Sequence, residues 1–236
     1  MTATPVTLDV GALERGALAH LVASLADNKA ALGRRYGEWA VSAPTLESAV
    51  AAAAMAQDEL GHARATYPLL KQLGGGELVA GDGNCMAVLG RELESWNVFV
   101  AVNFVVDGML TAFVRACEES AFVGLAQRAR KILQEERSHS VHARAWARRL
   151  SRDELQRDAF ASALGDAWWQ AARWAGPADD AEFASLVTGG FVAAGAGSLR
   201  DSLRATISEA LADTELAGVE LPEPRDWSGW NAEARL

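Results

Sequence analysis

Two short segments of the chain combine a carboxylate and an imidazole at a spacing that suits metal binding. "QDELGHAR" places Glu59 three residues before His62, and "QEERSHSVHAR" places Glu136 three residues before His139. On a helix, residues three apart share a face, so each pair offers an oxygen and a nitrogen to one point. Carboxylates can bridge and neutralise two divalent ions, and imidazole suits iron. The two pairs therefore predict metal ligands.

For either pair alone, the alternative is a solvated helix face. The chain has 18 glutamates and four histidines in 236 residues. A given histidine then has a chance of about 8% of following a glutamate by three residues, and two of four do so in about 4% of random cases. Coincidence is therefore the weaker explanation for the repeated pair.

A third carboxylate lies in an otherwise apolar run, "VAVNFVVDGMLTAFV", residues 100–114. A buried, unpaired carboxylate is costly, so Asp107 should have a partner. Asp107 precedes Glu136 by 29 residues, a distance that suits neighbouring antiparallel helices. Asn103, Asp107 and Thr111 also form a polar line at spacing four. Asp107 could instead be hydrogen-bonded to neighbouring side chains; we favour an interpretation in which it faces a metal or another cation.

Long helices should position these residues. Alanine, leucine, glutamate and arginine dominate the chain, and all are strong helix formers. Glycine and proline breaks then predict helices over about 13–36, 45–73 and 87–119. A fourth helix should run from a break near Ser120 to about 150, and a fifth, N-capped by Ser151, should end at Gly176.

Such helices predict a bundle. Two Glu-x-x-His motifs, with one carboxylate from each remaining helix, form the di-iron or di-manganese site of ferritin-like bundles. We therefore expect an all-α, ferritin-like four-helix bundle with additional C-terminal helices. No linker suggests a second domain, so residues 1–236 should form one domain. Its bundle core should span about 12–150, with C-terminal helices and a tail over 151–236.

The same spacing exposes a gap in the ligand set. A carboxylate on the first helix is expected 29 or 30 residues before Glu59, and that register holds Ala30 or Lys29. An ammonium group there could replace the charge of a metal ion. Three outcomes stay open at this stage: one metal, two metals in a weakened site, or a salt-bridge cluster without metal.

Charge and composition exclude several classes. The chain has 31 acidic and 22 basic residues and a net charge of −9, which argues against a nucleic-acid surface. We see no signal peptide and no uncharged apolar stretch of membrane-spanning length. Cys85 and Cys117 lack metal-site spacing, so free thiols in a cytoplasmic protein are expected.

Four segments resemble the ferritin-like subunits of phenylacetyl-CoA epoxidase, a multicomponent oxygenase of phenylacetate catabolism. They are "DNKAALGRRYGEWAVSAPTLESA", "AQDELGHAR", "FVVDGM" and "EERSHSVHARAW", and the resemblance covers about 26–146. In that family a catalytic subunit binds two irons, and a related structural subunit has lost the ligands. The first segment and the compact length are more similar to the structural subunit. The resemblance implies that Lys29 replaces a ligand glutamate and that the iron ligands are Glu59, His62, Asp107, Glu136 and His139.

The resemblance implies two alternative functions. The function that we expect, and that the five matching ligands favour, is that of an oxygenase subunit, which would use iron and electrons from a separate reductase to oxidise an aromatic acyl-CoA or a similar substrate. As a structural subunit, it would instead bind and order a catalytic homologue. Either role predicts a homodimer or a hetero-oligomer with a homologous oxygenase subunit; a ferroxidase or storage role is a distant third. Five tryptophans could form subunit contacts or pack in the core: Trp168, Trp169, Trp174, Trp227 and Trp230.

Overall fold

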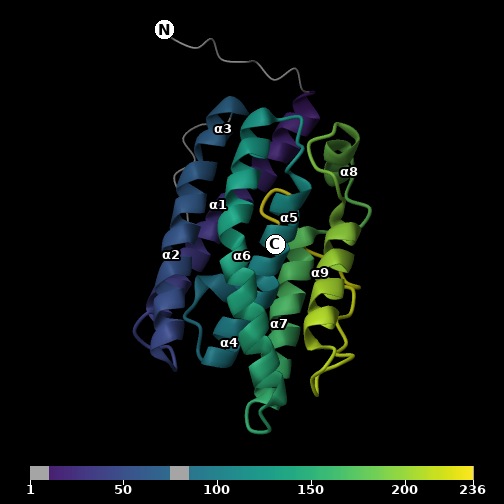
Figure 1. Cartoon of the computed structure of the whole chain (residues 1–236). Coiled ribbons are helices and arrows are strands. Elements are labelled where there is room, and N and C mark those ends of the chain that lie inside the picture. Colours follow the sequence, from purple (N-terminus) through teal and green to yellow (C-terminus); the bar gives the residue numbers. More distant parts are fainter. Residues whose placement is uncertain (1–10, 75–84, 236) are drawn as a thin grey trace.

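The computed structural model describes residues 11–74 and 85–235. Every regular element among these residues is helical, and the long helices pack side by side along a common direction (Figure 1). The predicted all-α, ferritin-like bundle is therefore confirmed. Its four long members are α1 (Ala12–Trp39), α2 (Leu46–Thr66), the continuous segment α4–η3–α5 between residues 96 and 116, and α6 (Val123–Arg152).

The first two helices form a closely packed hairpin. Thr45 is the N-cap of α2, because its hydroxyl oxygen accepts a hydrogen bond from the Ser48 amide at 3.2 Å. A Cβ on Gly33 would lie 2.7 Å from the Leu60 side chain, so this approach requires glycine. The predicted helix over 45–73 is wrong in its length. It is broken ahead of Pro68, which lacks an N–H and starts the short α3 (Pro68–Gln72).

The third long segment is the buried core of the bundle. It consists of α4 (Trp96–Ala101), the π-helical turn η3 (Val102–Val106) and α5 (Asp107–Ala116). The predicted start near residue 87 is wrong: Ala87–Gly90 forms only a 3-10 turn, η2, and the helix begins after the N-cap Ser95. By length and composition Trp96–Ala116 could cross a membrane, but 78% of its most apolar window is buried inside the protein.

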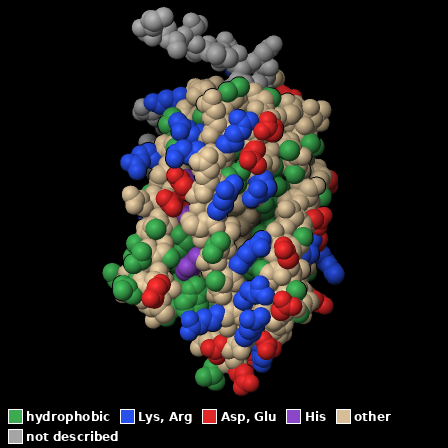
Figure 2. Space-filling model, viewed as in Figure 1, with side chains coloured by type: hydrophobic (Ala, Val, Ile, Leu, Met, Phe, Trp, Pro, Cys, Tyr) green, Lys and Arg blue, Asp and Glu red, His purple; other side chains and the backbone are tan. Residues whose placement is uncertain are grey.

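The fourth long helix, α6, runs along the front of the molecule. Blue side chains line its exposed surface (Figure 2), in a chain that is acidic overall. The predicted N-cap role of Ser151 is wrong. Ser151 lies in the last turn of α6, where its hydroxyl donates to the Ala147 carbonyl at 2.7 Å, and α7 (Arg157–Ala175) begins after an intervening turn.

The C-terminal elements cover one side of the bundle. Figure 1 shows α8 (Ala181–Thr188) and α9 (Ala196–Leu211) beside α5 and α7, followed by an irregular tail. Trp168 and Trp174 are buried, so core packing is their role, whereas Trp169 is 41% exposed. The Trp168 indole donates to the carbonyl of Pro222 at 2.8 Å, which ties the tail to α7. Most of the break predicted between the second and third helices falls on 75–84, outside the described residues.

Candidate functional site

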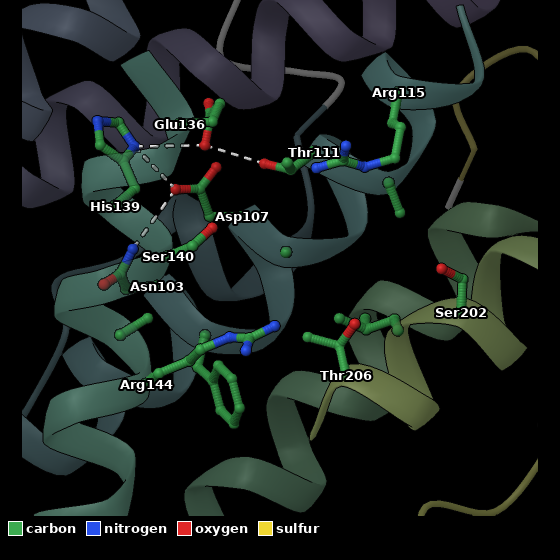
Figure 3. A pocket seen from close by; sticks show the side chains of 15 residues that line it. Asn103, Asp107, Thr111, Arg115, Glu136, His139, Ser140, Arg144, Ser202 and Thr206 are labelled. Atoms are coloured by element: carbon green, nitrogen blue, oxygen red, sulfur yellow. Dashed lines mark hydrogen bonds and ion pairs between the residues drawn. The ribbon is translucent and has the colours of Figure 1, made fainter. Parts of the chain in front are cut away.

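The structure brings the five sequence-predicted site residues to one place in the bundle. Glu59 and His62 come from α2, Asp107 from the start of α5, and Glu136 and His139 from α6. None of the five is more than 3% exposed. Figure 3 shows Asp107, Glu136 and His139 pointing toward one another, joined by dashed contacts. Convergence follows from the helix register, while their assignment as metal ligands stays a prediction.

Lys29 lies at the centre of this cluster. Its Nζ is 2.9 Å from Glu59 Oε1, 2.7 Å from Asp107 Oδ1 and 2.5 Å from Glu136 Oε1. The lysine is 0% exposed. An ammonium group has three hydrogens to donate, and here each can reach a different carboxylate. The cation that partners Asp107 is therefore Lys29.

Burial and charge act in opposite directions on these pKa values. Burial lowers the pKa of Lys29, but the combined attraction of the three carboxylates outweighs it and raises that pKa well above its ordinary value. Burial raises the pKa of Asp107, but the effects of Lys29 and then His139 are larger and bring that pKa below its ordinary value. Asp107 is therefore ionised. The pKa of Glu136 is lowered by the same cations against burial and the charge of Asp107. Burial and Asp107 together raise the pKa of Glu59.

His139 supplies a second positive charge. Its Nδ1 is 3.2 Å from Asp107 Oδ2, 3.3 Å from Glu59 Oε1 and 3.4 Å from Glu136 Oε2. Burial lowers its pKa, but hydrogen bonds to these carboxylates raise it well above the ordinary value. Two cations thus balance two ionised carboxylates.

The remaining pair of the cluster is Glu59 and His62, with His62 Nδ1 3.6 Å from Glu59 Oε2. The pKa of Glu59 is raised mainly by burial, and that of His62 is raised by Glu59 against the effect of burial. The ionised carboxylates of the cluster, Asp107 and Glu136, therefore have cations of the protein itself as partners.

Two further carboxylates hold the histidines from outside, and they do so crosswise. The Nε2 of His62 is 2.8 Å from Glu135 Oε2 on α6, and the Nε2 of His139 is 3.3 Å from Asp58 Oδ2 on α2. Neither Asp58 nor Glu135 was predicted as a site residue from the sequence. Their signal was present, since an acidic residue directly precedes Glu59 and Glu136 in both motifs. These contacts fix the imidazole orientation, as outer carboxylates do around histidine ligands.

A tyrosine that the sequence reasoning also missed completes the inner contacts. The Tyr36 hydroxyl donates to Asp107 Oδ2 at 3.2 Å and accepts from Asn103 Nδ2 at 3.2 Å. Tyr36 follows Lys29 by seven residues, two helical turns, which places both on one face of α1. Burial, followed by the neighbouring carboxylate charges, raises its pKa well above the ordinary value, so the hydroxyl stays protonated.

The predicted polar line along the core helix faces the cluster. The Thr111 hydroxyl lies 2.9 Å from Glu136 Oε2 and donates to it, and Asn103 lies 3.5 Å from Asp107 Oδ2. His142 stands one layer further out, with its Nδ1 3.2 Å from Asn103 Oδ1. Burial and the charge of His139 lower the His142 pKa to about 4, so it is neutral.

The carboxylates and the histidine of the cluster favour metal binding, whereas Lys29 opposes it. One ligand atom each from Glu59, Asp107, Glu136 and His139 lie within 4.8 Å of one another, which suits a divalent ion. Lys29 does not suit it, because its ammonium occupies the space between the three carboxylates. A protonated amine has no lone pair for a metal and repels one. With Lys29 in this position, the site does not fit a di-metal centre.

A family model described as phenylacetic acid catabolic protein matches residues 1–235. The chain belongs to this family. Membership supports the resemblance inferred from the four segments, and it places the chain among ferritin-like components of phenylacetate catabolism that work in multisubunit complexes. No curated protein matches the chain significantly.

Proposed function

We propose that the chain is a structural, non-catalytic subunit of a phenylacetyl-CoA epoxidase-type oxygenase, which binds and orders a metal-bearing homologue. The observation that carries this proposal is the Lys29 ammonium group, placed within 2.9 Å of all three cluster carboxylates. Lysine here supplies the charge that iron would otherwise supply. The cluster then stabilises the bundle and performs no chemistry.

A metal ion could bind in the cluster only by displacing Lys29. A metal entering between Glu59, Asp107 and Glu136 would have to expel a fully buried ammonium group from its three partners. The chain would then have to rehydrate that charge or remove its proton, although the carboxylates raise the Lys29 pKa. Breaking a buried, hydrogen-bonded ion pair costs several kcal/mol, on the order of 3–5. Metal binding must exceed this cost before it becomes favourable.

Exposed apolar side chains support a subunit role. Among the described residues, four of the ten exposed large hydrophobic side chains lie at the α1–α2 turn and along the outer face of α2: Val41 (91% exposed), Leu46 (77%), Val50 (62%) and Leu60 (43%). Figure 2 shows hydrophobic side chains clustered at the same end of α2. Such patches mark contact surfaces in proteins that work in complexes.

The test is activity of a reconstituted complex. The chain is co-expressed with a catalytic homologue, as wild type and as the variant Lys29→Met/Glu59→Gln, which removes the ammonium group and the carboxyl group of a predicted ligand. A structural role predicts that the variant, if it co-purifies at wild-type yield, supports full epoxidation by the partner. Loss of activity in an intact complex would assign the chemistry to this chain.

A second candidate, binding of a single metal ion, has one observation in its favour. The buried atoms Glu59 Oε2 and His62 Nδ1 lack hydrogen-bond partners and lie 3.6 Å apart. Glu136 Oε1 is 3.5 Å from the same nitrogen, so three donors surround one side of the cluster. This candidate retains the catalytic interpretation and predicts one tightly held ion per chain. Elemental analysis of the wild-type protein and of Lys29→Glu, which restores a carboxylate, separates the two candidates.

A further inference from the structure

A cavity of about 110 Å³ opens between α5, α6 and α9, next to the cluster. Its inner wall includes Asp107, Glu136 and His139. Two arginines, Arg115 from α5 and Arg144 from α6, also line it, and Figure 3 shows both guanidinium groups extending toward the central space. The cavity therefore has acidic residues that are already paired within the protein on its inner wall, together with two arginines.

The guanidinium groups of both arginines lack an acidic partner among the described residues. Among the described residues, 11–74 and 85–235, neither Arg115 nor Arg144 makes a salt bridge. Two other arginines of α6 do make salt bridges: Arg130 pairs with Glu119 at 3.0 Å and Arg148 with Asp213 at 3.2 Å. Two unpaired guanidinium groups from different helices on one small cavity form a natural receptor for an anion, because each offers a planar fork of donors.

The rest of the lining is suited to a compact organic molecule. Ala112, Ala143, Leu203 and Phe104 supply apolar surface. Hydroxyl groups at the same cavity come from Ser140, Ser202 and Thr206, and Figure 3 places Ser202 and Thr206 on α9, across from Arg144. The volume of 110 Å³ is below that of drug-sized ligand sites, which begin at about 300 Å³. It corresponds to an ion with a short apolar body.

We propose that this cavity binds a small organic carboxylate. The carboxylate group lies between Arg115 and Arg144, and the short apolar body packs against Ala112 and Leu203. The acidic residues of the inner wall already have partners within the protein, since Asp107 and Glu136 contact Lys29 at 2.7 and 2.5 Å and His139 at 3.2 and 3.4 Å. The inference is independent of the structural role proposed above, because it concerns binding to this chain alone and requires no metal.

The test is a nuclear magnetic resonance titration of the purified full chain with butyrate. Two matched probes accompany it: butyramide, which keeps the shape without the charge, and inorganic phosphate, which keeps charge without the apolar body. The inference predicts saturable shifts on α5, α6 and α9 with butyrate, and weaker binding of both other probes. Absence of saturable shifts with butyrate overturns it. Equal binding of butyramide excludes the arginine role, and tighter binding of phosphate excludes the organic carboxylate.

Three variants locate the site. Arg144→Gln removes one cation and should weaken butyrate binding about tenfold or more. Ala112→Leu fills the cavity without changing charge and should abolish the shifts. Arg137→Gln is the matched control, since Arg137 is an exposed arginine of α6 that does not line the cavity; it should bind like wild type. Circular dichroism confirms that each variant is folded. Wild-type affinity in folded Arg144→Gln and Ala112→Leu would place the binding elsewhere and refute the inference.

Discussion

Replacing Lys29 by methionine tests the charge balance of the cluster most sharply. Methionine keeps much of the side-chain volume and removes the ammonium group that lies within 2.9 Å of Glu59, Asp107 and Glu136. One uncompensated negative charge then remains in a site where every member is at most 3% exposed. Leaving a buried charge unpaired costs about 3–5 kcal/mol. For a chain of this length, that corresponds to a fall in melting temperature of about 6–20 °C.

The assay is thermal and urea denaturation of the purified variants, with Lys131→Met as the matched control. Lys131 is 67% exposed on its side chain and pairs with Glu135 at 3.1 Å. An exposed pair of this kind contributes about 0–1 kcal/mol, so the control should melt close to wild type. Adding Glu136→Gln to Lys29→Met should recover part of the lost stability, because it removes the excess negative charge. A Lys29→Met protein as stable as Lys131→Met would refute the reasoning.

Three further predictions concern groups around the cluster. Tyr36→Phe removes a donor to Asp107 and should cost about 1–3 kcal/mol in urea unfolding; an unchanged midpoint would exclude that hydrogen bond. Asp58→Asn removes a partly exposed partner of His139 and should cost less than about 1 kcal/mol in the same assay, so a larger loss than that of Tyr36→Phe would contradict the ranking. The pH dependence has two limbs. The pKa of Asp107 is lowered from 3.8, so its stabilisation is present above that value and is lost as pH falls below it. The pKa of His139 is raised from 6.5, so its stabilisation is complete below 6.5 and declines as pH rises above it. Urea midpoints from pH 3 to 9 should therefore peak between the two limbs, and a continuous rise toward pH 9 would contradict the charged state of His139.

Helix periodicity made the inner site predictable from sequence. Glu59 and His62 must share a face of any helix that contains them, and so must Glu136 and His139. Antiparallel helices then convert a sequence separation of about 29 residues into proximity, which located Asp107 and Lys29 relative to the two motifs. Lys29 does reach the predicted register, at 2.9 Å from Glu59. These long-range contacts could be predicted because the number of residues between the partners is set by the lengths of the helices that connect them.

Features that depend on hydrogen-bond competition were not predictable in the same way. The sequence around Ser151 predicts an N-cap, but the Ser151 hydroxyl donates a hydrogen bond to the carbonyl of Ala147 within α6. The π-helical turn η3 (Val102–Val106) lies immediately before Asp107, and the composition of this apolar segment does not distinguish it from an ordinary α-helix. The crossed contacts of Asp58 and Glu135 require knowledge of how α2 and α6 face each other. For Ser151 a local hydrogen bond within the helix replaced the predicted cap, and for Asp58 and Glu135 the contacts between α2 and α6 decided the outcome.

The iron and manganese content of the wild-type chain, purified from metal-supplemented cells without chelators, tests the central claim most directly. That claim is that Lys29 occupies the place of the metal ions. It predicts well below one ion per chain, together with a rise in metal content in Lys29→Glu, whose new carboxylate would complete the ligand set of Glu59, His62, Asp107, Glu136 and His139. Two tightly bound ions in the wild-type chain, unchanged in Lys29→Glu, would contradict it.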